Sequence, residues 1–310
     1  MSTTGRVVGY GVAVVALIAV TVVVAYWLRP PTAAPSLTPT TVTSASGGTT
    51  TVTATGSVTV STTGGAATSA GAGEAAADDG LALASSGRLF QAQLRLSEAL
   101  KAGIDGPKGK TVREKLAELA DKLQFSHSTT PEDIYSKMYT AVKNDALVKM
   151  GNKFMIPYQL IKKINGLTSD DITEGQQLKV VQGPMTIDIF KSKYELQVWC
   201  DKVCVRVFPI GIGADNKTPE GTFVIVNKEV NPKYEPLHKG PSAFKASGAA
   251  DNPLGSRWID IGNHYGIHGT IDPTSIGKNV SEGCIRLNNK DVEEVFDLVA
   301  LKLSKVTIHP

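Results

Sequence analysis

The sequence has 310 residues and a formal net charge of +3 at pH 7. This length allows more than one domain, and the chain has no Lys/Arg block interleaved with aromatic residues, which a nucleic-acid surface requires. The three cysteines, Cys200, Cys204 and Cys284, are too few for a disulfide scaffold, and at least one thiol must stay unpaired. Composition therefore excludes a nucleic-acid partner and favours a reactive cysteine.

Residues 7–28 form an apolar run without a charge. As a helix rising about 1.5 Å per residue, this run reaches about 33 Å, enough to cross a bilayer. Arg6 precedes it, and Tyr26 and Trp27 stand where interfacial aromatic residues belong. A cleaved secretory signal is the alternative, although its apolar core is usually shorter. We expect residues 1–29 to be a single-pass anchor in the cell membrane, with the rest of the chain in the periplasm or extracytoplasmic space.

Residues 30–80 consist mainly of Thr, Ala, Ser, Gly and Pro. Such a segment buries too little apolar surface to offset its ordering entropy, so we expect a disordered linker. Residues 81–126 then carry apolar positions at helical spacing in two stretches, around Leu96 and Leu116. They predict an α-helical hairpin that resembles one tetratricopeptide-like unit. Because a lone repeat cannot form a solenoid, a docking or spacer role is the simpler interpretation.

Residues 138–182 predict a strand, two short helices and a closing strand. This order, with KINGL at 163–167 and EGQQLKV at 174–180, resembles a LysM module. The family usually has a Gly-Asp pair before the first helix, whereas Asn144 and Asp145 stand here. The resemblance implies a shallow groove that binds glycans containing N-acetylglucosamine, such as peptidoglycan; a small domain without a ligand is the alternative.

Residues 185–310 show the period-2 alternation of a half-buried sheet, in TIDIF, YELQVW, VCVRVFPIG and GTFVIVNK. Helical spacing appears only in DVEEVFDLVALKL, before a final strand KVTIH. The expected fold class is therefore mixed, with a mostly-β C-terminal domain. Cys200 and Cys204 bracket a predicted hairpin turn, where a disulfide and two free thiols are both compatible with the sequence.

The stretch SEGCIRL contains the elements that a catalytic thiol needs. A nucleophilic cysteine requires a nearby imidazole, a site that lowers its pKa, and N–H donors aimed at an oxyanion. Gly283 leaves no side chain in front of Cys284, and the amides of both residues can serve as donors. His268 ends the strand-like YGIH and is followed by Gly269. On spacing alone, however, a Cys/His pair is more often structural than catalytic.

His264 and His268 lie four residues apart, which in a helix is zinc-ligand spacing. The local alternation predicts a strand instead, and no acidic or cysteine ligands accompany the pair. We therefore expect no metal and no other cofactor.

Several motifs occur together in the C-terminal domain: HGT at 268–270, SIG at 275–277 and SEGCIRL at 281–287. In this order they resemble the active-site signature of the YkuD-type L,D-transpeptidases. PIGIGADNKTPEGTFVI and NPLGSRWIDI are similar to further segments of that family. One departure is Glu282, where many members carry histidine. The resemblance implies a YkuD-like domain over residues 185–310, with a lid over the cleft at 231–248.

The resemblance also implies an activity, that of an L,D-transpeptidase, a cysteine acyltransferase of peptidoglycan biosynthesis. Cys284 would attack the L-centre carbonyl of meso-diaminopimelate in a stem tetrapeptide, with His268 as base and the Gly269 carbonyl orienting its ring. The residues implied in oxyanion or substrate binding are Gly283, Ser281, Arg286 and Asn288. The product would be a 3→3 cross-link. The alternatives are an L,D-carboxypeptidase, in which water takes the acyl group, and a non-catalytic wall-binding protein that acts through its LysM module.

Overall fold

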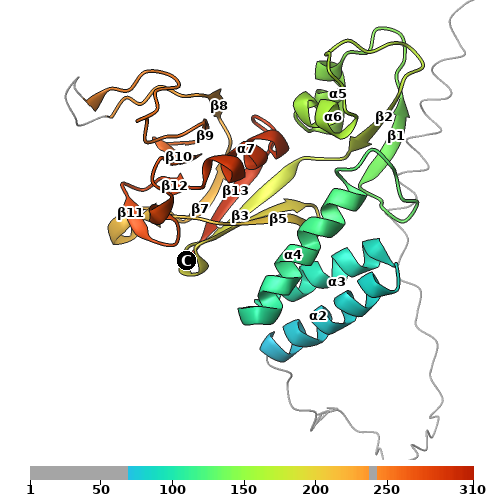
Figure 1. Ribbon diagram of the computed structural model, residues 1–310, viewed down its shortest axis with the longest axis horizontal. Helices are drawn as coiled ribbons and strands as arrows, with labels where there is room; N and C mark the ends of the chain where they lie inside the picture. Colours follow the sequence, from blue (N-terminus) through green and yellow to red (C-terminus); the bar gives the residue numbers. More distant parts are fainter. Residues whose placement is uncertain (1–68, 237–242) are drawn as a thin grey trace, which may run out of the picture. The chain divides into compact units, whose positions relative to one another are not determined.

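Three helices precede the LysM-like region in the computed structural model, which describes residues 69–236 and 243–310 (Figure 1). They are α2 (Ser69–Ser85), α3 (Leu89–Lys101) and α4 (Gly106–Leu123). The predicted hairpin corresponds to α3 and α4, whose apolar stripes are buried. Helix α2 corrects the last part of the predicted disordered linker of residues 30–80, because the chain is already helical from Ser69.

The Ala-rich composition of α2 explains why this segment is helical. Alanine has the highest helix propensity, and Ala76, Ala77 and Leu83 are buried. At Gly80 a Cβ atom would lie 2.7 Å from the Leu96 side chain, so glycine allows α2 to approach α3 closely. The small residues of α2 are therefore buried because the neighbouring helix α3 covers them.

The predicted membrane helix over residues 1–29 lies outside the described residues, as does the linker up to residue 68. Within the ranges that the structure describes, no helix combines the length and apolarity needed to cross a bilayer.

The LysM-like region has the predicted order of elements. Strands β1 (Ser136–Thr140) and β2 (Gln177–Val181) pair antiparallel, and helices α5 (Leu147–Phe154) and α6 (Tyr158–Ile164) lie between them in sequence. Asn144 takes φ 69°, a left-handed conformation that glycine adopts freely and asparagine tolerates. The Asp145 carboxylate accepts hydrogen bonds from the Val142 amide and the Tyr139 hydroxyl. The altered Asn-Asp pair thus still forms a tight turn before α5.

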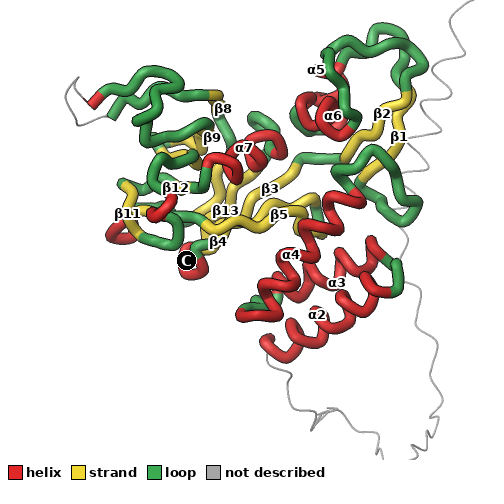
Figure 2. The backbone as a smooth tube through the Cα atoms, viewed as in Figure 1, coloured by secondary structure: helices red, strands yellow, loops and turns green. Residues whose placement is uncertain are grey.

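The regular secondary structure of the C-terminal part is mostly β-strand, as expected (Figure 2). A five-stranded sheet has the order β5-β4-β3-β13-β7, and a four-stranded sheet has the order β12-β10-β9-β8. The strands of the first sheet are β3 (Met185–Phe190), β4 (Glu195–Cys200), β5 (Val203–Pro209), β7 (Gly221–Val224) and β13 (Lys305–His309). Those of the second are β8 (Asn227–Val230), β9 (Arg257–Gly262), β10 (Tyr265–His268) and β12 (Ile285–Arg286). Strands β6 (Ile212–Gly213) and β11 (Asn279–Ser281) pair separately, and the predicted late helix is α7 (Asn289–Leu298).

The segment GTFVIVNK, predicted as one strand, is divided between the two sheets. Its first half is β7 and its second half begins β8, with Ile225 fully buried between them. The Ile225 amide donates to Ser304 O, and the Val226 amide donates to Asp260 O in the second sheet. Alternation alone cannot distinguish a straight strand from one that passes from sheet to sheet.

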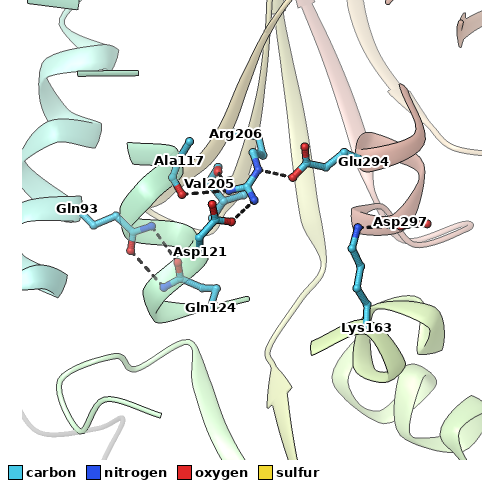
Figure 3. Close-up of polar contacts among 9 residues, drawn as sticks. All are labelled: Gln93, Ala117, Asp121, Gln124, Lys163, Val205, Arg206, Glu294 and Asp297. Carbon is cyan, nitrogen blue, oxygen red and sulfur yellow. Dashed lines mark hydrogen bonds and ion pairs between the residues drawn. The ribbon is translucent and has the colours of Figure 1, made fainter. Parts of the chain in front are cut away.

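The helices α3 and α4 pack against the edge strand β5. The Cys204 amide on this strand donates to Ser97 Oγ of α3 over 2.9 Å. The Arg206 guanidinium forms ion pairs with Asp121 of α4 and Glu294 of α7, as Figure 3 shows. Its Nη1 also donates to Ala117 O over 3.3 Å. Because of these contacts, α3 and α4 pack against the edge of the sheet and do not form a separate spacer.

Cys200 and Cys204 are separate, buried thiols, so the structure contains the unpaired alternative. Burial raises the pKa of the Cys200 thiol to about 12, and it raises the pKa of Cys204 as well. Both thiols therefore stay protonated and behave as apolar core residues.

Candidate active site

The pairing of two short strands brings the predicted histidine and cysteine together. Strand β10 runs parallel to β12, with Ile267 opposite Ile285 and His268 opposite Arg286. Cys284 precedes β12 by one residue and so lies beside Gly266. Because successive side chains alternate between the faces of a sheet, His268, Cys284 and Arg286 share one face. Residues separated in sequence thus meet at one edge of the second sheet.

The His268 ring is fixed in place from two sides. Its Nδ1 atom lies 2.6 Å from Gly269 O, and its ring stacks on Trp258 with the centroids 5.7 Å apart. A carbonyl oxygen can only accept, so Nδ1 carries the ring proton and Nε2 is the basic nitrogen. Burial lowers the pKa of His268 to about 4; the Gly269 hydrogen bond opposes this effect and the Arg286 charge adds to it. The imidazole is therefore neutral at pH 7.

The Cys284 thiol is half-buried, and its Sγ lies 3.9 Å from His264 O. Burial raises its pKa, while the Gly266 amide and the Arg286 charge oppose the rise. Asp260 and Glu282 raise the pKa further. The expectation that the site lowers the thiol pKa is therefore wrong, because desolvation outweighs the nearby cation. The site holds a neutral thiol beside a neutral imidazole, and the proton must move as the thiol attacks.

The loop before Cys284 is held by Ser281. The Ser281 hydroxyl donates to Cys284 O over 2.6 Å and accepts from the Gly283 amide over 3.1 Å. The Gly283 N–H is thus engaged by a serine two residues before it, a common turn hydrogen bond, and the oxyanion role of Gly283 stays a prediction. The Cys284 amide has no acceptor among the described residues, and it is the donor that remains available to an oxyanion.

Gly283 is required at its position for two reasons. Its φ is +127°, which L side chains rarely adopt, and a Cβ there would lie 2.6 Å from the Tyr265 ring. The carbonyl of Gly283 accepts a hydrogen bond from Thr218 Oγ1 over 2.9 Å, and the same hydroxyl accepts from the Gly213 amide over 2.8 Å. Thr218, which is 1% exposed, thus joins two chain segments beneath the cysteine.

The remaining predicted residues, Arg286 and Asn288, have different surroundings. The Arg286 Nε atom is buried and has no partner in the part of the chain that the structure describes, although it lies in the site. Asn288 instead precedes α7, and its Nδ2 donates to Asp291 over 3.1 Å. Asn288 therefore contacts the first turn of this helix, and its oxyanion or substrate role stays a prediction. An arginine whose buried Nε has no partner among the described residues is suited to bind a substrate carboxylate.

The sequence reasoning missed three residues that contact the site: Thr218, Trp258 and Asn289. Thr218 and Trp258 lie inside the motif segments TPEGTF and GSRWIDI, so their proximity to the site could have been inferred from those motifs. Nothing in the sequence pattern distinguishes Asn289 from Asn288.

The arms of the predicted lid, residues 231–248, are joined through Tyr234 and Lys245, whose main chains exchange two hydrogen bonds. Residues 237–242, which include His238, lie outside the described ranges. Across the ranges that are described, no cluster of three or more His, Cys, Asp or Glu side chains could hold a metal ion.

Comparison with known proteins identifies both regions. Residues 184–308 match the L,D-transpeptidase catalytic domain family YkuD, and residues 139–181 match the LysM domain family. A Bacillus licheniformis protein named as the L,D-transpeptidase YkuD is 32% identical over 52% of this chain and 93% of its own length. The chain belongs to the YkuD family of L,D-transpeptidases. The YkuD protein of Bacillus subtilis is 31% identical over 52% of this L,D-transpeptidase and 92% of its own length.

An Escherichia coli relative of the enzyme, named as the L,D-transpeptidase ErfK/SrfK, is 32% identical over 56% of this chain and 57% of its own length. Among solved structures, an L,D-transpeptidase from Mycobacterium smegmatis matches with a TM-score of 0.34 and 19% identity. The match covers 44% of this chain and 64% of that one. The predicted family, enzyme class and LysM domain are thus confirmed by the comparisons.

Proposed function

We propose that this L,D-transpeptidase joins peptidoglycan stem peptides in 3→3 cross-links through a thioester on Cys284. The observation that carries the proposal is the parallel pairing of β10 and β12, which sets His268 and Cys284 on one face. The hydrogen bond from Nδ1 to Gly269 O leaves Nε2 of this histidine unprotonated. A neutral base beside a neutral thiol is suited to acyl transfer at neutral pH.

Acylation begins when His268 Nε2 takes the thiol proton as Cys284 Sγ attacks the L-centre carbonyl of diaminopimelate in a stem tetrapeptide. The new C–S bond forms a tetrahedral oxyanion, which the Cys284 amide stabilises. As the carbonyl re-forms, the bond to D-alanine breaks, and the histidine returns the proton to the leaving amine. The products of this half-reaction are a thioester and free D-alanine.

In the second half-reaction an amine of another stem attacks the thioester. His268 removes a proton from this amine, and Cys284 leaves as the thiol after the C–S bond breaks. The new amide is the cross-link. Arg286 binds a carboxylate of the stem peptide, since its buried Nε has no partner among the described residues.

The proposal includes a role for the other regions, which is to keep the enzyme at the wall. The LysM-like domain, residues 138–182, holds the glycan strand, and the apolar run near the N-terminus anchors the enzyme in the membrane with residues 185–310 outside. Support comes from the match to the LysM family and from the uncharged run at residues 7–28.

The test is intact-protein mass spectrometry after incubation with a carbapenem, whose strained carbonyl is an acyl donor for a nucleophilic thiol. Wild type should gain one adduct mass, and Cys284→Ala should gain none. Cys200→Ala is the matched control and should react like wild type, because its thiol is buried and protonated. An adduct on Cys284→Ala, or none on wild type, would contradict the thioester mechanism.

The acyl acceptor is tested separately by incubating wild type with muropeptides. Cross-linked dimers are the expected product. Trimming of tetrapeptides to tripeptides without dimers would make the enzyme an L,D-carboxypeptidase, in which water takes the acyl group.

A further inference from the structure

The side chain of Asn289 fills a narrow slot between two glycines next to the catalytic histidine. A Cβ atom on either Gly255 or Gly269 would lie 2.1 Å from Asn289 Oδ1. Gly255 has φ +63°, which favours glycine in any case. Gly269 is not among the positive-φ glycines, so its backbone conformation would accept a side chain. The need for glycine at position 269 is therefore explained by the closeness of Asn289.

The carboxamide of Asn289 uses both of its ends on main-chain groups. Its Nδ2 donates to Thr270 O over 3.1 Å, and its Oδ1 accepts from the Ser256 amide over 3.1 Å. The Gly269 amide donates to Arg257 O over 3.3 Å. The peptide group before Gly269 and the peptide group after Thr270 are thus fixed to neighbouring segments, one on each side of the Gly269 carbonyl.

These contacts determine where the Gly269 carbonyl points. This carbonyl oxygen lies 2.6 Å from His268 Nδ1 and is the acceptor that holds the ring proton there. We propose that Asn289 is a positioning residue for His268, which keeps the imidazole in the Nδ1-protonated tautomer and leaves Nε2 free to accept the thiol proton. Its kinetic consequence rests on the proposed function, whereas the tautomer can be measured without any turnover.

A purely structural role for Asn289 predicts a different outcome. In that case the side chain would only brace the start of α7 against the loop. Its loss would lower the free energy of unfolding but would leave the ring proton on Nδ1. The tautomer of His268 therefore separates positioning from bracing.

The experiment uses the full chain labelled with ¹⁵N-histidine and records the ring nitrogens by NMR at pH 7, where His268 is neutral. The chain has five histidines, and His268→Gln identifies the signals of this residue by their absence. Wild type should show the Nδ1-protonated tautomer. Asn289→Ala should show a mixture that includes the Nε2-protonated form.

Asn289→Asp is a second variant that keeps the size of the side chain and replaces the N–H donor by an oxygen. It should shift the tautomer in the same direction, even if the alanine variant folds poorly. Asn227→Ala is the matched control, since Asn227 is exposed and its side chain hydrogen-bonds only to Glu229 among the described residues. It should give the wild-type spectrum. An unchanged tautomer in both Asn289 variants would overturn the proposal.

The rate of carbapenem acylation of Cys284 supplies the kinetic readout. Asn289→Ala should lower the maximal rate about 10²-fold with little change in the half-saturating concentration, because a misplaced base affects the chemical step. A reduced rate with an unchanged tautomer would indicate bracing and overturn the proposal. A shifted tautomer in a protein whose wild type is not acylated would support positioning while contradicting the proposed reaction.

Gly269→Ala tests the slot itself. Alone, it should slow acylation, because its methyl group would meet Asn289 Oδ1. In the double variant Gly269→Ala/Asn289→Ala this clash is absent, so the loss should be smaller than the product of the two single losses. Fully multiplicative losses would contradict a shared slot.

Discussion

The loop around Cys284 and the junction around Arg206 are held together by different kinds of contact. In the loop, neutral side chains hydrogen-bond to the main chain, as Thr218 does to Gly213 and Gly283. At the junction, charged side chains pair across elements; the Arg206 side chain is 11% exposed, whereas its carboxylate partners Asp121 and Glu294 are 62% and 33% exposed. Exposed ion pairs contribute little free energy and tolerate variation in geometry, whereas buried hydrogen bonds fix positions. Geometry is therefore fixed most tightly in the loop around Cys284.

The largest expected effect concerns the buried imidazole of His268, at the end of β10. The pKa of His268 is about 4 in the folded chain and 6.5 when exposed, so the unfolded chain binds more protons between these values. The free energy of unfolding should therefore be highest above pH 6.5 and should fall by about 3 kcal/mol as the pH falls towards 4, because protons bind the unfolded chain first. His268→Gln should lack this loss in urea denaturation measured from pH 4 to 7. The same pH dependence in both proteins would show that the ring is not buried in its neutral form.

The next effect concerns the hydroxyl beneath the cysteine. Thr218→Val keeps the shape of the side chain but leaves the buried Gly213 amide and Gly283 carbonyl without their partner. We expect the free energy of unfolding to fall by about 2 kcal/mol, and carbapenem acylation to slow, because the Cys284 loop is released. The matched control is Thr222→Val: the Thr222 hydroxyl is exposed and, within the ranges that the structure describes, hydrogen-bonds only to Thr307. Equal effects of the two substitutions would contradict the special role of the loop contacts.

The smallest effect belongs to the junction. Arg206→Met keeps an aliphatic chain near the Phe125 ring but removes the ion pairs to Asp121 and Glu294. It should lower the free energy of unfolding by about 1 kcal/mol without changing the acylation rate of Cys284. Lys163→Met, which breaks only the exposed pair with Asp297, should change stability by less than about 0.5 kcal/mol. A drop in acylation rate for Arg206→Met would remove the contrast between the two regions.

The strands and the cysteine motif could be predicted because their signals are local. Alternation is visible in β3, where Met185, Ile187 and Ile189 are buried and the residues between them are not. His268 and Cys284 stand in short motifs, so their meeting could be inferred before the strand pairing was known. The Gly269 contact with the histidine ring also joins neighbours in sequence, and it has the predicted geometry.

The features that were missed depend on partners distant in sequence. Helix α2 reads as a linker because alanine and glycine bury surface only when another helix covers them, as Leu96 does for Gly80. Thr218 and Gly283 are 65 residues apart, and no local pattern links them. The raised pKa of Cys284 follows mainly from burial, which a motif does not encode. The engagement of the Gly283 amide depends on the rotamer that Ser281 adopts.

The slot around Asn289 has a consequence for how this part of the protein can change during evolution. Positions 255, 269 and 289 share one volume, since a methyl group on either glycine would overlap the asparagine oxygen. A homologue with a larger residue at position 269 should therefore carry a smaller one at position 289, and a single substitution at either site should be selected against. Positions 269 and 289 are therefore expected to covary, whereas position 255 should stay glycine, because its φ is +63° and a Cβ there would also lie 2.8 Å from the main chain at Gly269.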